Sequence, residues 1–121
     1  MESEKSHPPR TRSVFRNISP LDHRYYLANE ETFEALSDYL SEEAAVRYLI
    51  RVEAALLKAH LSRPGAEGAE YLKDIDTLEE RVSPDEVYRE EEKTRHNIRA
   101  LVNVIKRKVP PAVRSLVHAG A

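Results

Sequence analysis

Apolar residues along this chain recur at spacings of three and four, which is the period of an amphipathic helix. The longest such run lies in residues 42–61. Its apolar positions form one stripe, made of Ala45, Leu49, Val52, Leu56 and Ala59. Ser41 is a typical N-cap, and Glu42 and Glu43 place negative charge in the first turn, where the helix dipole favours it. We therefore predict a helix over 42–61 that ends near Ser62-Arg63-Pro64-Gly65.

Two further helical patterns flank this one. The earlier pattern begins after Asn29, a possible N-cap, and its apolar residues are Phe33, Leu36 and Leu40. The later one follows a loop over 64–69, and its apolar residues are Tyr71, Leu72, Ile75 and Leu78. The spacing in each predicts a short amphipathic helix.

The last two predicted helices have clear end signals. Ser83, Pro84 and Glu86 combine an N-cap, a first-turn proline and the second half of a capping box, so a short helix should start there. A final apolar pattern is made of Ile98, Leu101, Val102, Ile105 and Val109. It predicts a helix over about 94–108, which Pro110-Pro111 would end.

No stretch alternates apolar and polar residues for long enough to predict a sheet, so the fold class is all-α. Residues 1–13 contain two prolines and, after Met1, no large apolar side chain, which is typical of a disordered tail. We expect one helical domain over 14–121. The stripe in the helix over 42–61 has no equal among the other segments, which favours packing against a neighbouring domain or subunit.

Composition excludes several classes of protein. The 121 residues include no cysteine, which rules out disulfides, thiolate metal sites and cysteine nucleophiles, and fits a reducing compartment. The net charge of −2, with 33% charged residues, gives no general attraction to nucleic acid or anionic lipid. No apolar run approaches the ~18 residues of a membrane span, and the start of the chain lacks a signal sequence. We expect a cytoplasmic protein that binds neither nucleic acid nor membrane.

A few residues are candidates for chemistry. His96 lies at the start of a predicted helix, where an imidazole could exchange a proton or contact an anion, or could simply be a capping residue. His118 precedes three small residues that would let a ligand approach the backbone, but it could equally be an ordinary surface residue. Arg24 and Tyr25 could clamp a phosphate, or serve in a salt bridge and in packing. No metal-binding motif is present.

Three separated segments resemble motifs of one enzyme family. Ser19-Pro20-Leu21-Asp22-His23-Arg24-Tyr25 is similar to an S-P-x-D-x-R-Y signature. Lys93-Thr94-Arg95-His96-Asn97 resembles an E-x-x-T-x-H-D element, and Val117-His118-Ala119-Gly120-Ala121 resembles the start of an H-x-G-x-T-S-x-D element. Their order and spacing match the N-terminal domain of the adenylosuccinate lyase family, within the fumarase/aspartase superfamily.

The resemblance implies a cytoplasmic enzyme of purine biosynthesis that releases fumarate from adenylosuccinate and from the corresponding succinyl-carboxamide ribotide. The reaction is a β-elimination that needs no cofactor, and the full-length family enzyme is a homotetramer. At the matching positions, Arg24 and Tyr25 would bind the nucleotide phosphate, with Arg95 and Asn97 also binding substrate. His96 would support proton transfer on the acid side, and His118 would bind the charged groups of the substrate.

Two departures from the family pattern affect these expectations. Asn97 stands where the family usually has aspartate, although an amide oxygen can still accept a hydrogen bond. The third motif reaches Ala121 before its Thr-Ser, so the resemblance covers only the N-terminal part of a lyase, and we expect the chain alone to be inactive. Two alternatives stay open: a small helical interaction module that binds a partner helix through the 42–61 stripe, and the same domain of argininosuccinate lyase or another fumarate-releasing relative.

Overall fold

The structure is a computed structural model that describes residues 13–19 and 22–121, apart from the side chains of His23 and Arg24. In this part of the chain the regular elements are helices, and there is no strand, so the predicted all-α class is confirmed. In chain order the elements are η1 (Val14–Arg16), α1 (Asp22–Tyr25), α2 (Glu30–Leu40), α3 (Glu42–Leu61), η2 (Ala69–Tyr71), α4 (Leu72–Asp76), α5 (Leu78–Arg81), α6 (Pro84–Thr94), α7 (Asn97–Lys108) and η3 (Pro111–Leu116).

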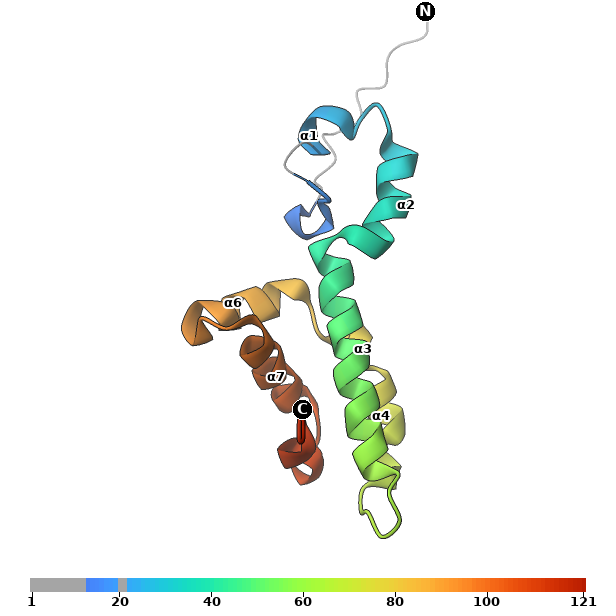
Figure 1. The fold of residues 1–121 in the computed structure, drawn as a ribbon, viewed down its shortest axis with the longest axis vertical. Helices are drawn as coiled ribbons and strands as arrows, with labels where there is room; N and C mark the ends of the chain where they lie inside the picture. Colours follow the sequence, from blue (N-terminus) through green and yellow to red (C-terminus); the bar gives the residue numbers. More distant parts are fainter. Residues whose placement is uncertain (1–12, 20–21) are drawn as a thin grey trace, which may run out of the picture.

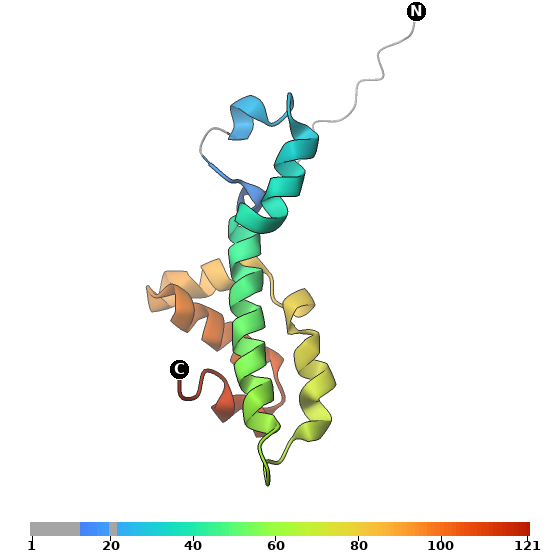
Figure 2. The same ribbon diagram turned by 45° about the vertical axis from the view of Figure 1, so that its right-hand side comes forward.

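The 20-residue helix α3 is the spine of the molecule (Figure 1). α1 and α2 lie beyond its N-terminal end, and α4 runs back along its C-terminal half (Figure 2). α6 and α7 form a helical hairpin beside its middle, and η3 brings the C-terminal segment back toward α3 (Figures 1 and 2). No helix of the described residues is long and apolar enough to cross a bilayer.

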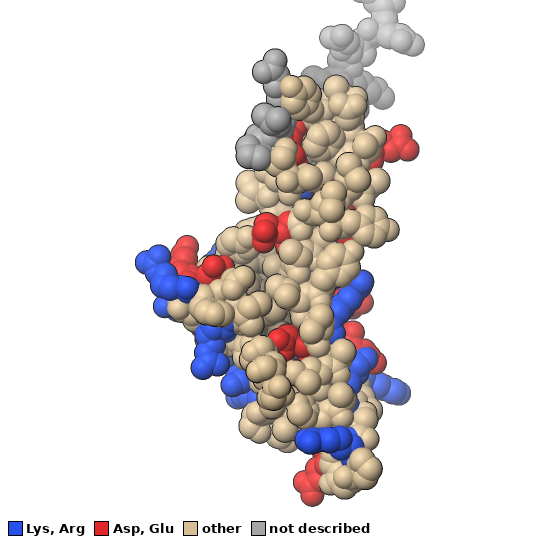
Figure 3. Space-filling view, viewed as in Figure 1, with Lys and Arg blue, Asp and Glu red and all other residues tan. Residues whose placement is uncertain are grey.

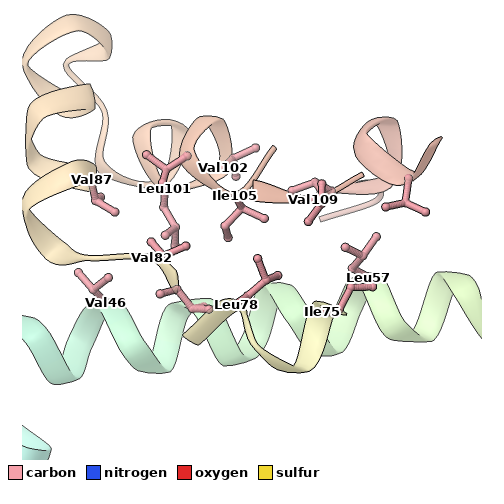
Figure 4. Packing of buried hydrophobic residues seen from close by; sticks show 14 of the residues in the cluster. Val46, Leu57, Ile75, Leu78, Val82, Val87, Leu101, Val102, Ile105 and Val109 are labelled. Atoms are coloured by element: carbon pink, nitrogen blue, oxygen red, sulfur yellow. The ribbon is translucent and has the colours of Figure 1, made fainter. Parts of the chain in front are cut away.

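A single apolar cluster joins these elements. α3 supplies one side of it, α7 the other, and Ile75, Leu78 and Val82 fill the space between them (Figure 4). Leu57 on α3 and Leu101 on α7 are each 1% exposed. Because burying such side chains contributes about 1.5 to 3 kcal/mol each, this cluster is the main source of the domain's stability.

The face of α3 that enters this cluster is not the stripe predicted from periodicity. The buried residues that face the cluster are Val46, Ile50, Glu53, Leu57 and Leu61. The predicted stripe of Ala45, Leu49, Val52, Leu56 and Ala59 is exposed or half-buried instead. α3 is apolar on two neighbouring faces, so spacing alone could not show which of them packs. That a neighbouring domain or subunit packs against the predicted stripe stays a prediction.

Helix ends follow local signals in most places. Ser41 and Ser83 cap α3 and α6 as predicted, and Glu86 completes the capping box of α6. The predicted helix over residues 71–78 is instead divided at Thr77, whose hydroxyl donates to the carbonyl of Asp74 at 2.7 Å. Such a side-chain bond to the backbone competes with the helix ladder.

η1 is fastened to α2 and α3 through one guanidinium. Arg16 donates to Glu43 and Asp38, each at 2.9 Å, and to Glu34 at 3.2 Å. Partial burial acts to lower the pKa of Arg16, but the hydrogen bonds to Asp38 and Glu43 outweigh it and raise that pKa above its ordinary value. The Ser37 hydroxyl also donates to the Arg16 carbonyl at 2.8 Å. These contacts hold the chain just before the first motif.

Two leucines on α3 test which of its faces packs. We expect Leu57→Ala to lower the free energy of unfolding by about 2 to 5 kcal/mol, because it leaves a cavity in the core. Leu49→Ala should lower it by less than about 1 kcal/mol, since Leu49 is 37% exposed. Urea denaturation of both variants measures the difference, and equal losses would contradict the observed packing.

The capping box gives a prediction about pH. Hydrogen bonds from Lys108 and from the Ser83 backbone lower the pKa of Glu86. A depressed folded-state pKa means that this carboxylate adds stability above its unfolded pKa of about 4.3 and loses that contribution as the pH falls through the lower folded pKa. Glu86→Gln should therefore be less stable than the parent chain at neutral pH and equal to it at about pH 2. Urea titrations across pH check this, and Glu80→Gln, an exposed acid on α5, is the control.

Candidate functional site

The first motif is organised by a buried carboxylate. Asp22 is 0% exposed, and its oxygens accept hydrogen bonds from the backbone N–H groups of Ile18 at 2.7 Å and Ser19 at 2.9 Å. The Ser19 hydroxyl donates to the same carboxylate at 3.1 Å. These bonds hold Ile18 and Ser19 against the first residue of α1, so the aspartate of the motif has a structural role.

α1 carries the two residues predicted to bind phosphate. The side chain of Arg24 lies outside the described part of the structure. Tyr25 is 45% exposed, and its backbone carbonyl accepts a hydrogen bond from the Asn29 side chain at 3.2 Å. Asn29 occupies the predicted N-cap position of α2, but its side chain bonds to α1 and makes no capping hydrogen bond to α2.

The second motif forms the corner between α6 and α7. Arg95 ends α6 in the left-handed region with φ 57°, which turns the chain, so α7 begins at Asn97 and not near residue 94 as predicted. Thr94 braces the corner, because its hydroxyl donates to the His96 carbonyl at 3.0 Å and accepts from the His96 N–H at 3.3 Å. The corner places the exposed side chains of Arg95, His96 and Asn97 next to one another.

His96 is the N-cap of α7, and this determines its protonation pattern. Its Nδ1 accepts a hydrogen bond from the Arg99 N–H at 3.1 Å. A ring nitrogen that accepts carries no proton, so the neutral imidazole must carry its proton on Nε2. His96 therefore presents an N–H donor to solvent at the start of a 12-residue helix.

Asn97 lines a groove of about 310 Å³ between α3 and the α6–α7 hairpin. Its other lining side chains include Ala45, Leu49, Tyr88 and Glu91. The Asn97 Oδ1 accepts from the Ile98 N–H at 2.9 Å. Among the described residues, no hydrogen bond joins the Asn97 amide to His96.

Glu42 and Tyr88 also line this groove. The Tyr88 hydroxyl donates to Glu42 Oε2 at 2.8 Å. Burial and this hydrogen bond to a carboxylate raise the pKa of Tyr88 to about 12, so the phenol stays neutral at physiological pH. The described groove wall includes the carboxylates of Glu42 and Glu91 and no lysine or arginine.

The third motif contacts α3 through a carboxylate and imidazole pair. His118 Nδ1 lies 2.7 Å from Glu53 Oε1, and its backbone is in the left-handed region with φ 62°. The side chain of Glu53 is 10% exposed, and its Oε2 is buried with no hydrogen-bond partner. A ring nitrogen of His60, Nε2, lies 2.8 Å from the Ala119 carbonyl and holds the next residue in place.

The structure brings some of the predicted site residues near the same helix and separates others. Asn97 and Leu49 line the same groove, and His118 bonds to Glu53, which lies one turn or about 6 Å beyond Leu49 along α3. α1, which carries Tyr25, lies beside the N-terminal part of α2, beyond the N-terminal end of α3, in both ribbon views (Figures 1 and 2). Asn97 of the second motif and His118 of the third therefore lie beside α3, whereas α1 of the first motif lies beyond the N-terminal end of that helix (Figures 1 and 2).

Sequence reasoning missed Glu53 and Asp22. Glu53 interrupts the apolar series Val46, Ile50, Leu57 and Leu61 at helical spacing. A charged residue inside a core register was a signal that could have been found, had the packed face of α3 been known. Asp22 was part of the quoted motif, but only the fold shows that it is buried.

Comparison of the chain with protein-family models, curated proteins and solved structures finds no match. Among residues 13–19 and 22–121, no group of three His, Asp or Glu side chains could hold a metal ion. The chemistry of the site must therefore be argued from its own geometry.

The capping role of His96 gives a test of its geometry. His96→Ala should lower the free energy of unfolding by about 1 kcal/mol, because the Arg99 N–H loses its acceptor. His96→Asn should restore that stability, since asparagine is a favoured N-cap. Urea denaturation compares the two variants, and equal stability would contradict the cap.

Proposed function

We propose that this domain supplies substrate-binding residues to a carbon–nitrogen lyase that releases fumarate, of the adenylosuccinate lyase type. The proposal rests on the three motif-like segments and on one structural observation. His96 and His118 each have Nδ1 engaged by the protein, and no partner for Nε2 is found among the described residues. Two imidazoles with one nitrogen fixed and the other available are suited to holding a polar substrate.

The reaction explains why such groups would be useful. In the β-elimination, a base takes a proton from the carbon next to a carboxylate, the C–N bond breaks, and an acid protonates the departing nitrogen. The Nε2–H of His96 is a donor, which suits contact with the substrate on the side where the nitrogen departs. The carbanion formed beside the carboxylate also needs hydrogen-bond donors or positive charge around it.

The remaining functions are assigned to the residues that match the motifs. Arg24 and Tyr25 would bind the nucleotide phosphate, and Arg95 and Asn97 would contact the substrate at the corner between α6 and α7. Because α1 lies far from that corner, one chain would use these two groups in different sites, or would meet the other group from another subunit. A homotetrameric enzyme of purine biosynthesis, active in the cytoplasm without a cofactor, is the assembly that the resemblance implies.

A second candidate function is a protein-interaction module. It is favoured by the exposed stripe on α3 and by Leu36 and Leu40, which are exposed on α2. In the space-filling view the face over α2 and α3 is almost uncharged, with isolated acidic groups, and Lys and Arg lie mainly at its margins (Figure 3). A partner helix could cover this face with its own apolar side.

Ligand titration of the ¹⁵N-labelled chain tests the lyase proposal. We expect adenylosuccinate, and more weakly fumarate, to shift the NMR signals of His96 and Asn97. His96→Asn should weaken that binding by about tenfold, because it keeps the cap but removes the Nε2–H donor, and a hydrogen bond to a charged ligand contributes about 1.5 to 3 kcal/mol.

Lys73→Gln, an exposed change on α4 outside the motifs, is the control and should bind like the parent chain. The interaction module is the better explanation under two results together. Neither ligand shifts any signal of the α6–α7 corner, and light scattering shows that the chain self-associates but that Val52→Glu does not. Equal binding by His96→Asn would remove His96 from the proposed site.

A further inference from the structure

Glu53 is an unusual residue for its position. It lies in the packed face of α3, with Ile50 and Leu57 three and four residues away on either side. One of its oxygens, Oε2, is buried without a partner. Burying a carboxylate oxygen without a hydrogen bond is unfavourable, so an apolar residue of similar length would suit the core better. The packing of α3 gives no reason for a carboxylate here.

The other oxygen gives a reason. Oε1 lies 2.7 Å from His118 Nδ1, a length typical of a charge-assisted hydrogen bond. A carboxylate can only accept, so Nδ1 must carry the proton in this pair. The neutral imidazole then has an unprotonated Nε2, on a side chain that is 36% exposed. This pattern is the reverse of that in His96, where Nδ1 accepts and Nε2 carries the proton.

The backbone around His118 is also held in an unfavourable conformation. A residue other than glycine at φ 62° is strained, and such strain persists only where surrounding contacts maintain it. Here the contacts are the bond to Glu53 on one side and the contact between His60 and the Ala119 carbonyl on the other. Glu53 and His60, which make these contacts, both lie on α3, the 20-residue helix at the centre of the fold.

We propose that Glu53 is the positioning residue of His118, which holds the proton on Nδ1 and presents an unprotonated Nε2 to a ligand that donates a hydrogen bond. The identity of that ligand as a lyase substrate rests on the proposed function. The positioning itself does not, because it depends only on contacts within this chain. Glu53 touches no ligand in this arrangement and acts through the imidazole.

Nitrogen NMR of the histidine rings tests the proposal in the full chain. Two-bond ¹H–¹⁵N spectra recorded at about pH 8.5, which is above the ordinary pKa of histidine, distinguish protonated from unprotonated ring nitrogens. In the parent chain we expect His118 to show a protonated Nδ1 and an unprotonated Nε2. In Glu53→Met we expect the Nε2 signal to move toward the protonated range, because the acceptor for Nδ1 is lost.

Glu53→Gln is the conservative variant, because its amide oxygen still accepts from Nδ1, and it should keep the parent pattern. His96 is the internal reference and should show the opposite pattern, unchanged in all three chains. Because Oε2 has no partner, the urea midpoint of Glu53→Met should equal or exceed that of the parent chain. If Glu53 served only to stabilise the fold, Glu53→Met would instead have a lower urea midpoint than the parent chain, and the ¹⁵N signals of the His118 ring would not change.

The proposal is overturned if His118 of the parent chain carries its proton on Nε2, or if Glu53→Met leaves its ring nitrogens unchanged. These results are separate from the outcome of ligand titration. If the ring responds to Glu53→Met and no substrate binds, the lyase function fails while the positioning role of Glu53 stands.

Discussion

The packing of one face of α3 is the constraint on which the rest of this structure depends. Ile50 and Leu57 bury that face in the apolar cluster shared with α7. Ile75, Leu78 and Val82 fill the space between the two helices. Once this face is buried, the positions of the hairpin corner and of the C-terminal segment beside α3 follow. The cluster therefore serves the candidate site, because it places Asn97 and His118, which come from two separate motif segments, beside the same helix.

The division of α3 into two apolar faces also links stability to recognition. The packed face supplies the core, and its neighbour, which includes Leu49 and Val52, stays exposed. Glu53 belongs to the packed face, yet its Oε1 lies 2.7 Å from Nδ1 of His118, whose side chain is 36% exposed. The groove at Asn97 is lined by a residue of each face, Val46 and Leu49.

The two histidines show how a fixed neighbour can determine which ring nitrogen of an imidazole carries the proton. Each imidazole has one nitrogen bonded to the protein, but His96 accepts from a helix N-terminus and His118 donates to a carboxylate. The available nitrogen is consequently a donor in one and an acceptor in the other. This difference arises from fixed neighbours, so it does not require a bound ligand.

The sequence by itself determined the helical class and most helix ends, because periodicity and caps such as Ser41 and Ser83 act within a few residues. It also marked His96 as a capping candidate, since that role depends on a neighbour three residues away. Only the tertiary structure decided which face of α3 is buried, because both faces have helical spacing. It alone paired His118 with Glu53, 65 residues earlier in the chain, because a contact at that separation depends on how the helices pack.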